Sequence, residues 1–441
     1  MIKPKPISWF YENLPEEQII EDKFKEIIKK NYSLSGFTPL DTPNIERVEA
    51  LTSKWADDSE IYWIKRLKAE WDELSTFELW LRFDLTVPLA RYIAQYEWNI
   101  NFPFKRQHIW RVYRWERPQK GRYREFYQAD IDIIWNWNLP LFADVEILYT
   151  IYSSLKELNF WDFEIQVNNK KILVWFLESI WVINIVEAIW VIDKKDKVKK
   201  DKLKEMFLWI SLNNEMISKI EVFIELSENR TSKEILEGFK SYDNILLQEW
   251  LKELEYIYNN LISLWANSDY IKINTAISRG LNYYTGTVFE TFIKWSEKLW
   301  SIASWWRYEN LASNFTKNNF PWVWWSIWLS RLLSVLKELW KIETLNKTVT
   351  QVLVLNMWED LLTSNLHIVK KIRELGINVE IYLDSGAKFK KQLNYANQKN
   401  IPYVIIQWED AIKKGTIQLK DLRNWEQKEI MINELKNINF N

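Results

Sequence analysis

Three arginines lie where the sequence predicts the ends of strands, and guanidinium groups in such places are suited to chemistry on phosphate. Arg114 ends the apolar run 104–114, Arg279 opens the segment Arg-Gly-Leu-Asn-Tyr-Tyr, and Arg331 follows a strand-to-helix turn. A guanidinium group is charged at every physiological pH and binds phosphate oxygens in a bidentate manner. Each arginine alone is better explained by a surface ion pair, but three on separate rigid elements favour a triphosphate site.

The common nucleotide-binding and catalytic motifs are absent from the sequence. Trp340-Lys341 is followed by Ile342, where a P-loop needs Ser or Thr, and residues 322–328 do not match G-x-G-x-x-G even with glycine in place of each tryptophan. The chain has no cysteine, which excludes disulfides, thiolate zinc sites and a cysteine nucleophile. Its two histidines, His108 and His367, are far apart, which argues against a multi-histidine metal site.

Length and charge set broader bounds. A chain of 441 residues predicts two to four domains. The 59 Lys and Arg balance 60 Asp and Glu, so a polyanionic partner must be bound by a local basic patch. No apolar run reaches about 18 residues and the first residues do not resemble a signal peptide, so we expect a soluble, cytoplasmic protein without a membrane partner.

The ratio of glycine to tryptophan is unusual. Glycine occurs 8 times and tryptophan 29 times, whereas average usage of about 7% predicts about 31 glycines in a chain of this length. The two counts taken together come close to that expectation. The positions of the tryptophans therefore need an explanation.

Several tryptophans stand where backbone geometry favours glycine. Trp161, Trp265 and Trp340 close helical runs, Trp425 follows an asparagine in a turn, and Trp408 follows a buried strand. We hypothesise that most of these positions are encoded by UGA and are glycine in the natural protein, because some bacterial lineages translate UGA as glycine. The printed sequence would then show tryptophan because it was translated with another code. The alternative is a protein truly rich in tryptophan, and the codons decide between the two.

Hydrophobic periodicity predicts the elements that must position the arginines. Residues 16–34 predict an amphipathic helix, and Leu79–Val87 predicts a strand that leads into a helix at Pro88–Tyr96. The alternating runs Phe104–Arg114 and Phe126–Ile134 enclose a charged loop. This pattern indicates a hairpin with a long loop.

Two other parts of the chain have distinct patterns. Residues 172–262 are helical and highly charged, and strands resume at Lys272–Ser278 and Gly286–Thr291. After the polar stretch Glu343–Thr350, short apolar runs alternate with helical segments, which predicts a small α/β domain with a parallel sheet. The runs are Val352–Asn356, Val379–Leu383 and Tyr403–Gln407, and the helical segments are Leu366–Leu375 and Lys388–Gln398.

These segments carry a resemblance to a known family. Phe104–Gln128 is similar to motif 2 of class II aminoacyl-tRNA synthetases in its histidyl form, and Arg279–Glu290 is similar to a segment peculiar to histidyl-tRNA synthetases. Residues 305–308 and 322–331 resemble the G-G-R-Y segment and motif 3 of that family, with tryptophan where the family has glycine. Gly36–Glu46 resembles motif 1, and the C-terminal part of the chain resembles an anticodon-binding domain.

The resemblance implies a fold and a division into domains. The expected fold is α+β, with the antiparallel sheet core of a class II synthetase flanked by helices, a helical insertion and a C-terminal α/β anticodon-binding domain. The catalytic core would span residues 1–171 and 263–342, the insertion 172–262, and the anticodon-binding domain 350–441.

The resemblance also implies a reaction. The family ligates L-histidine to tRNA(His) with ATP and Mg²⁺ through a histidyl-adenylate, as a cytoplasmic homodimer. The nearest alternative is a synthetase-like regulatory subunit of ATP phosphoribosyltransferase, although such proteins generally lack the anticodon-binding domain and erode the catalytic segments. A tryptophan-rich single-strand binder and a nicotinamide enzyme are weaker alternatives.

By motif position, the resemblance assigns roles to individual residues. Arg114 would hold the α-phosphate of ATP, Glu116 would lie in the same site, Arg331 would contact the γ-phosphate, and Arg279 would stabilise charge on the α-phosphate. The remaining assignments concern the other two substrates. The α-amino group of histidine would be bound by Asp84, Thr86 and Gln128, its imidazole by Asp132, Tyr284 and Tyr308, and the tRNA by Gln119, Arg122 and Arg124.

The sequence departs from the family in three respects. Asp84 and Asp132 replace a glutamate found in many bacterial members, and Asn282 replaces an aspartate. Literal tryptophan at 305, 306, 324, 325 and 328 would fill the space where ATP approaches the backbone closely.

Overall fold

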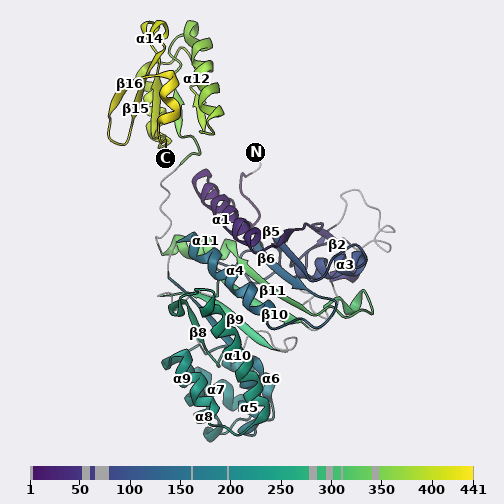
Figure 1. Ribbon diagram of the computed structural model, residues 1–441. Helices are drawn as coiled ribbons and strands as arrows, with labels where there is room; N and C mark the ends of the chain where they lie inside the picture. The colour runs from purple at the N-terminus through teal and green to yellow at the C-terminus, as the bar shows by residue number, and fades with distance from the viewer. Residues whose placement is uncertain are drawn as a thin grey trace. The chain divides into compact units, whose positions relative to one another are not determined.

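The computed structural model has one large sheet and two smaller ones in its described residues (Figure 1). It describes residues 3–51, 60–64, 79–159, 162–195, 198–277, 286–294, 301–308, 311–339 and 347–440, with the backbone alone of Trp305 and Trp306. The chain divides into two compact units, one formed by residues 1–11 and 24–342 and the other by residues 12–23 and 343–441.

The sheet of the first unit has eight strands in the order β1-β5-β6-β11-β10-β9-β7-β8. The pairings from β5 through to β7 are antiparallel, whereas the edge strands β1 and β8 pair in parallel. This confirms the predicted α+β class and the hairpin. The strands are β1 (Thr38–Pro39), β5 (Phe104–Tyr113), β6 (Glu125–Ile134), β7 (Phe163–Asn169), β8 (Ile271–Ile273), β9 (Thr287–Ile293), β10 (Ala303–Tyr308) and β11 (Trp322–Trp328).

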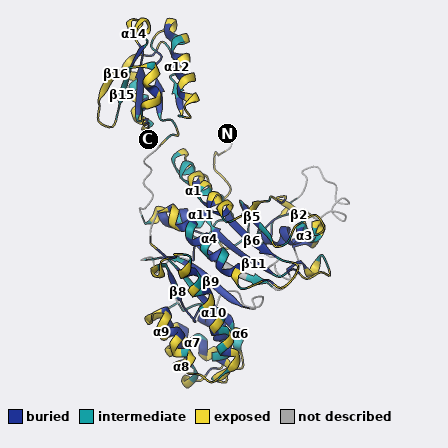
Figure 2. Ribbon diagram, in the orientation of Figure 1, coloured by how far each residue is buried: buried dark blue, intermediate teal, exposed yellow. Residues whose placement is uncertain are grey.

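Alternation along the strands separates the two faces of this sheet. Lys105 on β5 pairs with Glu146 of α4, and Lys25 of α1 lies over the ring of Tyr127 on β6. Odd-numbered residues of these strands therefore face the helices α1 (Pro15–Leu34) and α4 (Phe142–Leu158), and even-numbered residues face the opposite side. Figure 2 shows that the central strands of this sheet are largely buried.

A short segment on the other side of the sheet differs from the prediction. The strand expected at Leu79–Val87 is limited to β4 (Leu79–Leu81), which pairs with β2 (Ile45–Arg47) and β3 (Trp63–Ile64). The backbone N–H of Val87 donates to Asp84 Oδ1 at 3.0 Å, and the helix α3 (Thr86–Tyr96) begins there. A side-chain acceptor at the start of a helix satisfies an N–H that the helix itself leaves unpaired.

In its described residues the charged segment from Lys170 to Ser263 contains six helices, and the first four surround a core of their own. Four of them begin at side-chain caps, because Asn169, Asn213, Thr231 and Asn244 each accept a backbone N–H from the first turn. Apolar residues such as Phe207 and Ile220 form the core. The helices are α5 (Lys170–Ser179), α6 (Ile185–Ile192), α7 (Lys200–Trp209), α8 (Asn214–Asn229), α9 (Ser232–Lys240) and α10 (Ile245–Ser263).

The C-terminal unit contains the predicted strand–helix alternation and two further strands. In its sheet, of order β13-β12-β14-β15-β16, the first three strands are parallel as expected and the last two are antiparallel. Ile368 of α12 packs on one face of the sheet and Ala396 of α13 on the other. The elements are β12 (Val352–Val354), α12 (Leu362–Glu374), β13 (Val379–Ile381), α13 (Phe389–Gln398), β14 (Tyr403–Ile406), α14 (Glu409–Lys414), β15 (Thr416–Asp421) and β16 (Gln427–Met431).

Among the described residues, four tryptophans have the left-handed backbone that favours glycine. Trp9, Trp181, Trp265 and Trp425 have φ between 64° and 69°, a region that L-residues with a side chain rarely adopt. The expected positions 265 and 425 are among them. Trp408 is not, since its φ of −110° is open to any residue. Positions 161 and 340 lie outside the described residues.

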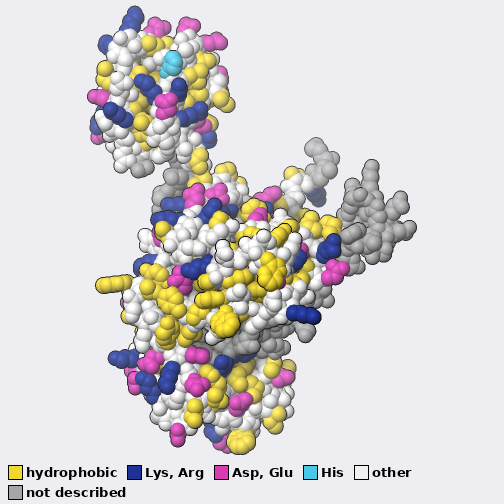
Figure 3. Space-filling model, turned by 45° about the vertical axis from the view of Figure 1, so that its right-hand side comes forward, with side chains coloured by type: hydrophobic (Ala, Val, Ile, Leu, Met, Phe, Trp, Pro, Cys, Tyr) yellow, Lys and Arg dark blue, Asp and Glu magenta, His cyan; other side chains and the backbone are white. Residues whose placement is uncertain are grey.

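Two of these tryptophans end helices in the way that a glycine of the same chain does. The N–H of Trp265 donates to Ile262 O, and the next N–H donates to Leu261 O. Trp181 makes the same pair of bonds, and so does Gly376 after α12. This is the Schellman arrangement, in which glycine is the usual residue. Trp265 is also 92% exposed, and Figure 3 shows hydrophobic side chains on the surface among charged ones.

We expect Trp265→Gly to raise the free energy of unfolding by about 1 kcal/mol, because it removes a Cβ from a left-handed residue. Trp209→Gly is the matched control, since Trp209 is also exposed but lies in the last turn of α7. There glycine should lower the free energy by about 1 kcal/mol. Urea unfolding measures both, and equal changes of the same sign would contradict the backbone argument.

Candidate active site

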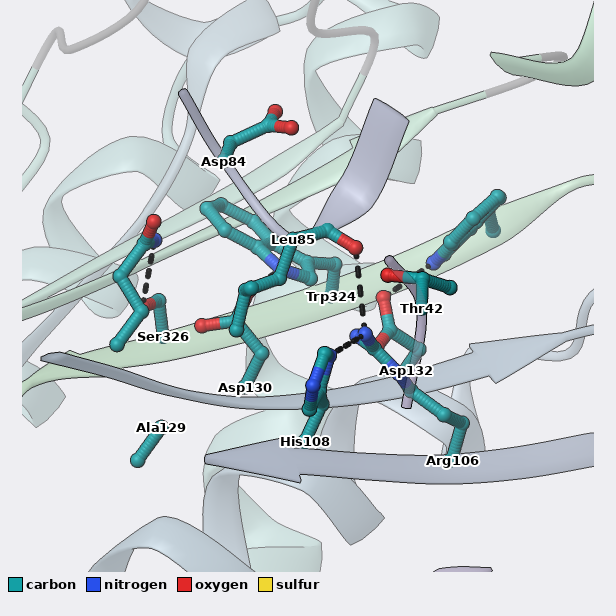
Figure 4. A network of polar contacts seen from close by, with 12 residues as sticks. Thr42, Asp84, Leu85, Arg106, His108, Ala129, Asp130, Asp132, Trp324 and Ser326 are labelled. Carbon is teal, nitrogen blue, oxygen red and sulfur yellow. Dashed lines mark hydrogen bonds and ion pairs between the residues drawn. The ribbon is translucent and has the colours of Figure 1, made fainter. Parts of the chain in front are cut away.

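Polar side chains gather on the face of the sheet that α1 and α4 leave uncovered. The strands β5, β6 and β11 run side by side, so Arg106, Asp132 and Trp324 are direct cross-strand neighbours. His108, Asp130 and Ser326 form the next row. We call this set the sheet pocket, and Figure 4 shows that its side chains point toward one another.

A buried ion pair lies at the centre of the sheet pocket. Arg106 Nη1 and Asp132 Oδ2 are 2.7 Å apart, and both side chains have no solvent exposure. Arg106 Nη2 donates to the backbone carbonyl of Leu85 at 3.2 Å and also contacts His108 Nδ1. His108 Nε2 lies 2.8 Å from Asp41 Oδ1. One guanidinium group thus connects two strands to the segment that precedes α3.

Two indole rings donate to the aspartates of the sheet pocket. Trp322 Nε1 donates to Asp132 Oδ1 at 2.8 Å, and Trp324 Nε1 donates to Asp130 Oδ2 at 2.8 Å. Both tryptophans are buried. The geometry shows that Asp132 has one oxygen held by a cation and the other placed to accept the N–H of a flat heteroaromatic ring.

Burial dominates the electrostatics of these carboxyl groups. It raises the pKa of Asp130 to about 7 and that of Asp132 to about 6. The two negative charges oppose one another, and Arg106 works in the other direction by stabilising both carboxylates. The pKa of His108 is lowered by burial and by the positive charges of Arg106 and Arg82, so His108 is neutral.

The three residues expected to bind an amino group line the same region. Gln128 is fully buried on β6 and donates to Ser326 Oγ at 3.1 Å, and Thr86 is buried at the start of α3. Burial raises the pKa of Asp84, while the N–H of Val87 and the charge of Arg114 lower it. Asp84 therefore remains close to a cation that favours its ionised form.

The loop between β5 and β6 brings three of the predicted residues together. Glu116 Oε1 lies 3.5 Å from Arg114 Nη1, and Glu116 Oε2 lies 2.7 Å from Arg122 Nε. Arg114 Nε also donates to the carbonyl of Phe83 at 2.8 Å, next to Asp84. The loop is closed by paired backbone hydrogen bonds between Gln119 and Arg122.

Arg331 joins this loop from α11 (Leu329–Glu338). Its Nε donates to the carbonyl of Gly121 at 3.1 Å and its Nη1 to that of Ser301 at 2.9 Å, while the guanidinium lies over the ring of Trp328. Arg124 instead stacks on Trp115, 3.7 Å from the ring centroid. The structure thus places Arg114, Glu116, Arg122 and Arg331 around one loop.

Not every predicted site residue can be located. Arg279 and Tyr284 lie outside the described residues. Tyr308 is the cross-strand neighbour of Trp322, whose indole bonds to Asp132, so it lies at the same end of the pocket. Among the described residues, no group of three acidic or histidine side chains is placed to hold a metal ion.

Arg106, His108 and Asp130 were not predicted as site residues. Their common signal is weak in the sequence, because it consists of polar residues at alternate positions in two apolar strands. Only the register of the hairpin, which pairs Arg106 with Asp132 and His108 with Asp130, shows that these residues share one face. Chemically, the pocket offers carboxylate acceptors for N–H groups beside a cluster of arginines for anions.

Comparisons with known proteins agree with one another. The family described as "Histidyl-tRNA synthetase" matches residues 10–332, and the family described as "Anticodon binding domain" matches residues 351–438. A protein of Clostridium tetani named histidine–tRNA ligase is 39% identical over 98% of this chain and 97% of its own length.

Solved structures give the same result. Histidyl-tRNA synthetase from Nostoc sp. has a TM-score of 0.89 and 32% identity, covering 99% of this chain and all (100%) of that one. A structure described as an ATP phosphoribosyltransferase regulatory subunit/histidyl-tRNA synthetase from Bacillus halodurans has a TM-score of 0.71 at 19% identity, with coverage of 90% and 97%. That second likeness concerns the fold alone. No helix in the described ranges is long and apolar enough to cross a membrane.

The raised pKa of Asp130 predicts how stability depends on pH. Between about pH 4 and pH 7 the folded chain retains a proton that the unfolded chain has lost, so the free energy of unfolding falls as pH rises. Asp130→Asn should reduce this fall, because the amide does not titrate. Urea unfolding at pH 5 and pH 8 measures the difference. Asp201→Asn on exposed α7 is the control, and an unchanged slope in Asp130→Asn would contradict the assignment.

Proposed function

Since the chain belongs to the histidyl-tRNA synthetase family, we propose that its histidine is bound at the sheet pocket and its ATP at the arginine cluster beside it. The chain catalyses the ATP-dependent ligation of histidine to tRNA(His). The observation that carries the pocket assignment is the bond from Trp322 Nε1 to Asp132 Oδ1 at 2.8 Å. An imidazole N–H is the same kind of donor as an indole N–H, so this carboxylate can accept it.

The proposed histidine site has two ends. At one end Asp132 accepts a ring N–H, with Tyr308 beside it and Tyr284 supplied by a segment outside the described residues. At the other end the carboxylate of Asp84, with Thr86 and Gln128, binds the α-ammonium group. A carboxylate is the natural partner for an ammonium ion, and the neighbouring buried groups exclude side chains that cannot satisfy them.

The proposed ATP site is the arginine cluster around the loop that follows β5. A histidine carboxylate oxygen attacks the α-phosphorus, the bond to the bridging oxygen breaks, and pyrophosphate leaves. A tRNA ribose hydroxyl then attacks the activated carbonyl and AMP leaves. Arg114 and Arg279 would stabilise charge on the α-phosphate, Arg331 would bind the γ-phosphate, and Glu116 would hold Arg114 in place.

Magnesium would enter this site with ATP. Glu116 is bound by two arginines, and the ion would be held mainly by phosphate oxygens. Bound there, magnesium would neutralise part of the phosphate charge. The loop residues Gln119, Arg122 and Arg124 are proposed to meet the acceptor end of the tRNA, since basic and stacking groups alternate there.

We propose that the active form is a homodimer in the cytoplasm, where ATP and tRNA are found. Its support is the motif 1 resemblance of Gly36–Glu46, which includes the edge strand β1. The domain limits stay those proposed from the sequence, with the insertion at 172–262 and the anticodon-binding domain at 350–441. The family match at 351–438 supports the last of these limits and disfavours the regulatory-subunit alternative.

The tryptophan hypothesis is part of this proposal. In the sheet pocket the indoles of Trp322 and Trp324 take the acceptors that histidine would need. Four other tryptophans have a left-handed backbone. Both observations support glycine at these positions. We call the protein that has glycine at every position encoded by UGA the glycine form.

Trp325 is proposed to be the exception. It is an odd-numbered residue of β11, so it points to the helix side rather than into the pocket, and its fully buried ring stacks on Phe289 with centroids 5.9 Å apart. Glycine here would leave a void in the core, which costs about 3–5 kcal/mol for the loss of so large a side chain. This modifies the expectation from the sequence, which treated position 325 like its neighbours.

The glycine form should catalyse histidine-dependent exchange of pyrophosphate into ATP, and Asp132→Asn should raise its KM for histidine about 100-fold. The KM for ATP should change little, because Asp132 is proposed to contact only the imidazole. Asp144→Asn is the control, since Asp144 is equally buried and paired with an arginine, but on the helix side. Absence of exchange in the glycine form would refute the assignment of the pocket.

The codons and the mass of the natural protein test the tryptophan hypothesis. We expect UGA at 322, 324 and 328 and UGG at 325, with peptide masses from native protein showing glycine at the first three positions. The chain with tryptophan at all 29 positions should bind no histidine in calorimetry, because indoles fill the pocket. UGG at every position would overturn the hypothesis, and UGA at 325 would overturn its exception.

A further inference from the structure

Arg106 lies between the two ends of the proposed histidine site and contacts both. Its Nη1 pairs with Asp132, and its Nη2 donates to the backbone carbonyl of Leu85, the residue between Asp84 and Thr86. We propose that Arg106 is a positioning residue for histidine recognition, and that His108 and Asp41 hold Arg106 in turn. This inference rests on the assignment of Asp132 to the imidazole.

Arg106 fixes the directions of the hydrogen bonds that connect it to His108 and Asp41. A guanidinium group has only donors, so His108 Nδ1 must be an acceptor and the ring proton must be on Nε2. His108 Nε2 then donates to Asp41 Oδ1 at 2.8 Å. Burial and the nearby positive charges lower the pKa of His108 and keep it neutral, as this arrangement requires.

This arrangement determines which oxygen of Asp132 the substrate meets. Oδ2 is taken by Arg106, so Oδ1 is the oxygen left facing the pocket, where Trp322 now donates to it. Arg106 cannot release a proton, so it keeps Asp132 as an acceptor rather than a donor. Without this cation the carboxyl group could rotate or be protonated, and either change would remove the acceptor for an imidazole N–H.

The charges around the pair set the expected pH dependence. Asp132 is faced by Arg106 and Trp322, and by the charges of Asp84 and Asp130. Arg106 is faced by His108 and by the cation Arg82, which itself lies 3.7 Å from Asp41. Because Arg106 lowers the pKa of Asp132, its removal raises that pKa further. The acidic limb of kcat/KM for histidine should then move to higher pH.

The test uses pyrophosphate exchange by the glycine form and its Arg106→Gln variant across pH 5.5 to 9. We expect the KM for histidine to rise about 10- to 100-fold, with the KM for ATP within about twofold and the acidic limb shifted upward. Lys105→Gln is the matched control, because Lys105 is the preceding residue of β5 and pairs with Glu146 on the other face. It should leave the KM for histidine and the pH profile unchanged.

A second pair of variants covers the case in which Arg106→Gln does not fold. His108→Gln can accept from Arg106 and donate to Asp41, whereas His108→Leu can do neither. We expect His108→Gln to keep the KM for histidine within about threefold and His108→Leu to raise it about tenfold or more. A merely structural role would lower kcat and stability together without moving the histidine KM or the pH limb.

Two failures can be told apart. If the glycine form itself shows no exchange, the proposed function fails. If it exchanges normally but folded Arg106→Gln, or both His108 variants, leave the KM for histidine and the acidic limb unchanged, the role of Arg106 is refuted.

Discussion

The alternation of side chains across one antiparallel sheet is the constraint on which the rest of this structure depends. In β6 and β11 the same backbone supplies a largely apolar layer for α1 and α4 and polar side chains for the pocket, to which β5 adds Arg106 and His108. A shift of register by one residue would exchange the two layers completely. The long hairpin of β5 and β6, with ten residues in each strand, makes such a shift costly.

The polar layer contains buried negative charges, and a positive charge next to them compensates them. Asp130 and Asp132 are both fully buried, and a single buried arginine stabilises them. Burial of an ion pair is not in itself a source of stability, because both ions lose their hydration. The pair is better understood as a device that fixes one carboxylate in position for a ligand.

Much of this could be predicted from the sequence, and the rest could not for physical reasons. The first helix followed from its helical period, and the hairpin followed from two runs rich in apolar residues that enclose a charged loop. The strand expected at Leu79–Val87 was too long, since Asp84 accepts from the N–H of Val87 and helix begins there. The strands β15 and β16 were missed, because β16 is mostly exposed and lacks a buried run.

The site was predictable only in part for the same kind of reason. Asp132, Gln128 and Arg114 were identified by resemblance to a motif that is continuous in sequence. Arg106 and His108 gain their meaning from partners on other strands and from Asp41, which lies in a separate segment. No pattern within a single strand contains that information. Trp408 shows the opposite error, because position after a strand suggested a left-handed residue where the backbone is extended.

The same alternation explains why neighbouring tryptophans in β11 have different surroundings. At 322 and 324 the side chain lies on the pocket face, next to buried residues such as Leu89 and Ile93, and its indole N–H donates to an aspartate of the sheet pocket, where we propose that histidine binds. At 325 the side chain points into the core, where its ring stacks on Phe289 and its buried Nε1 has no hydrogen-bond partner. Strand geometry therefore places the side chains of positions 322 and 324 on one face of the sheet and that of position 325 on the other, next to different neighbours.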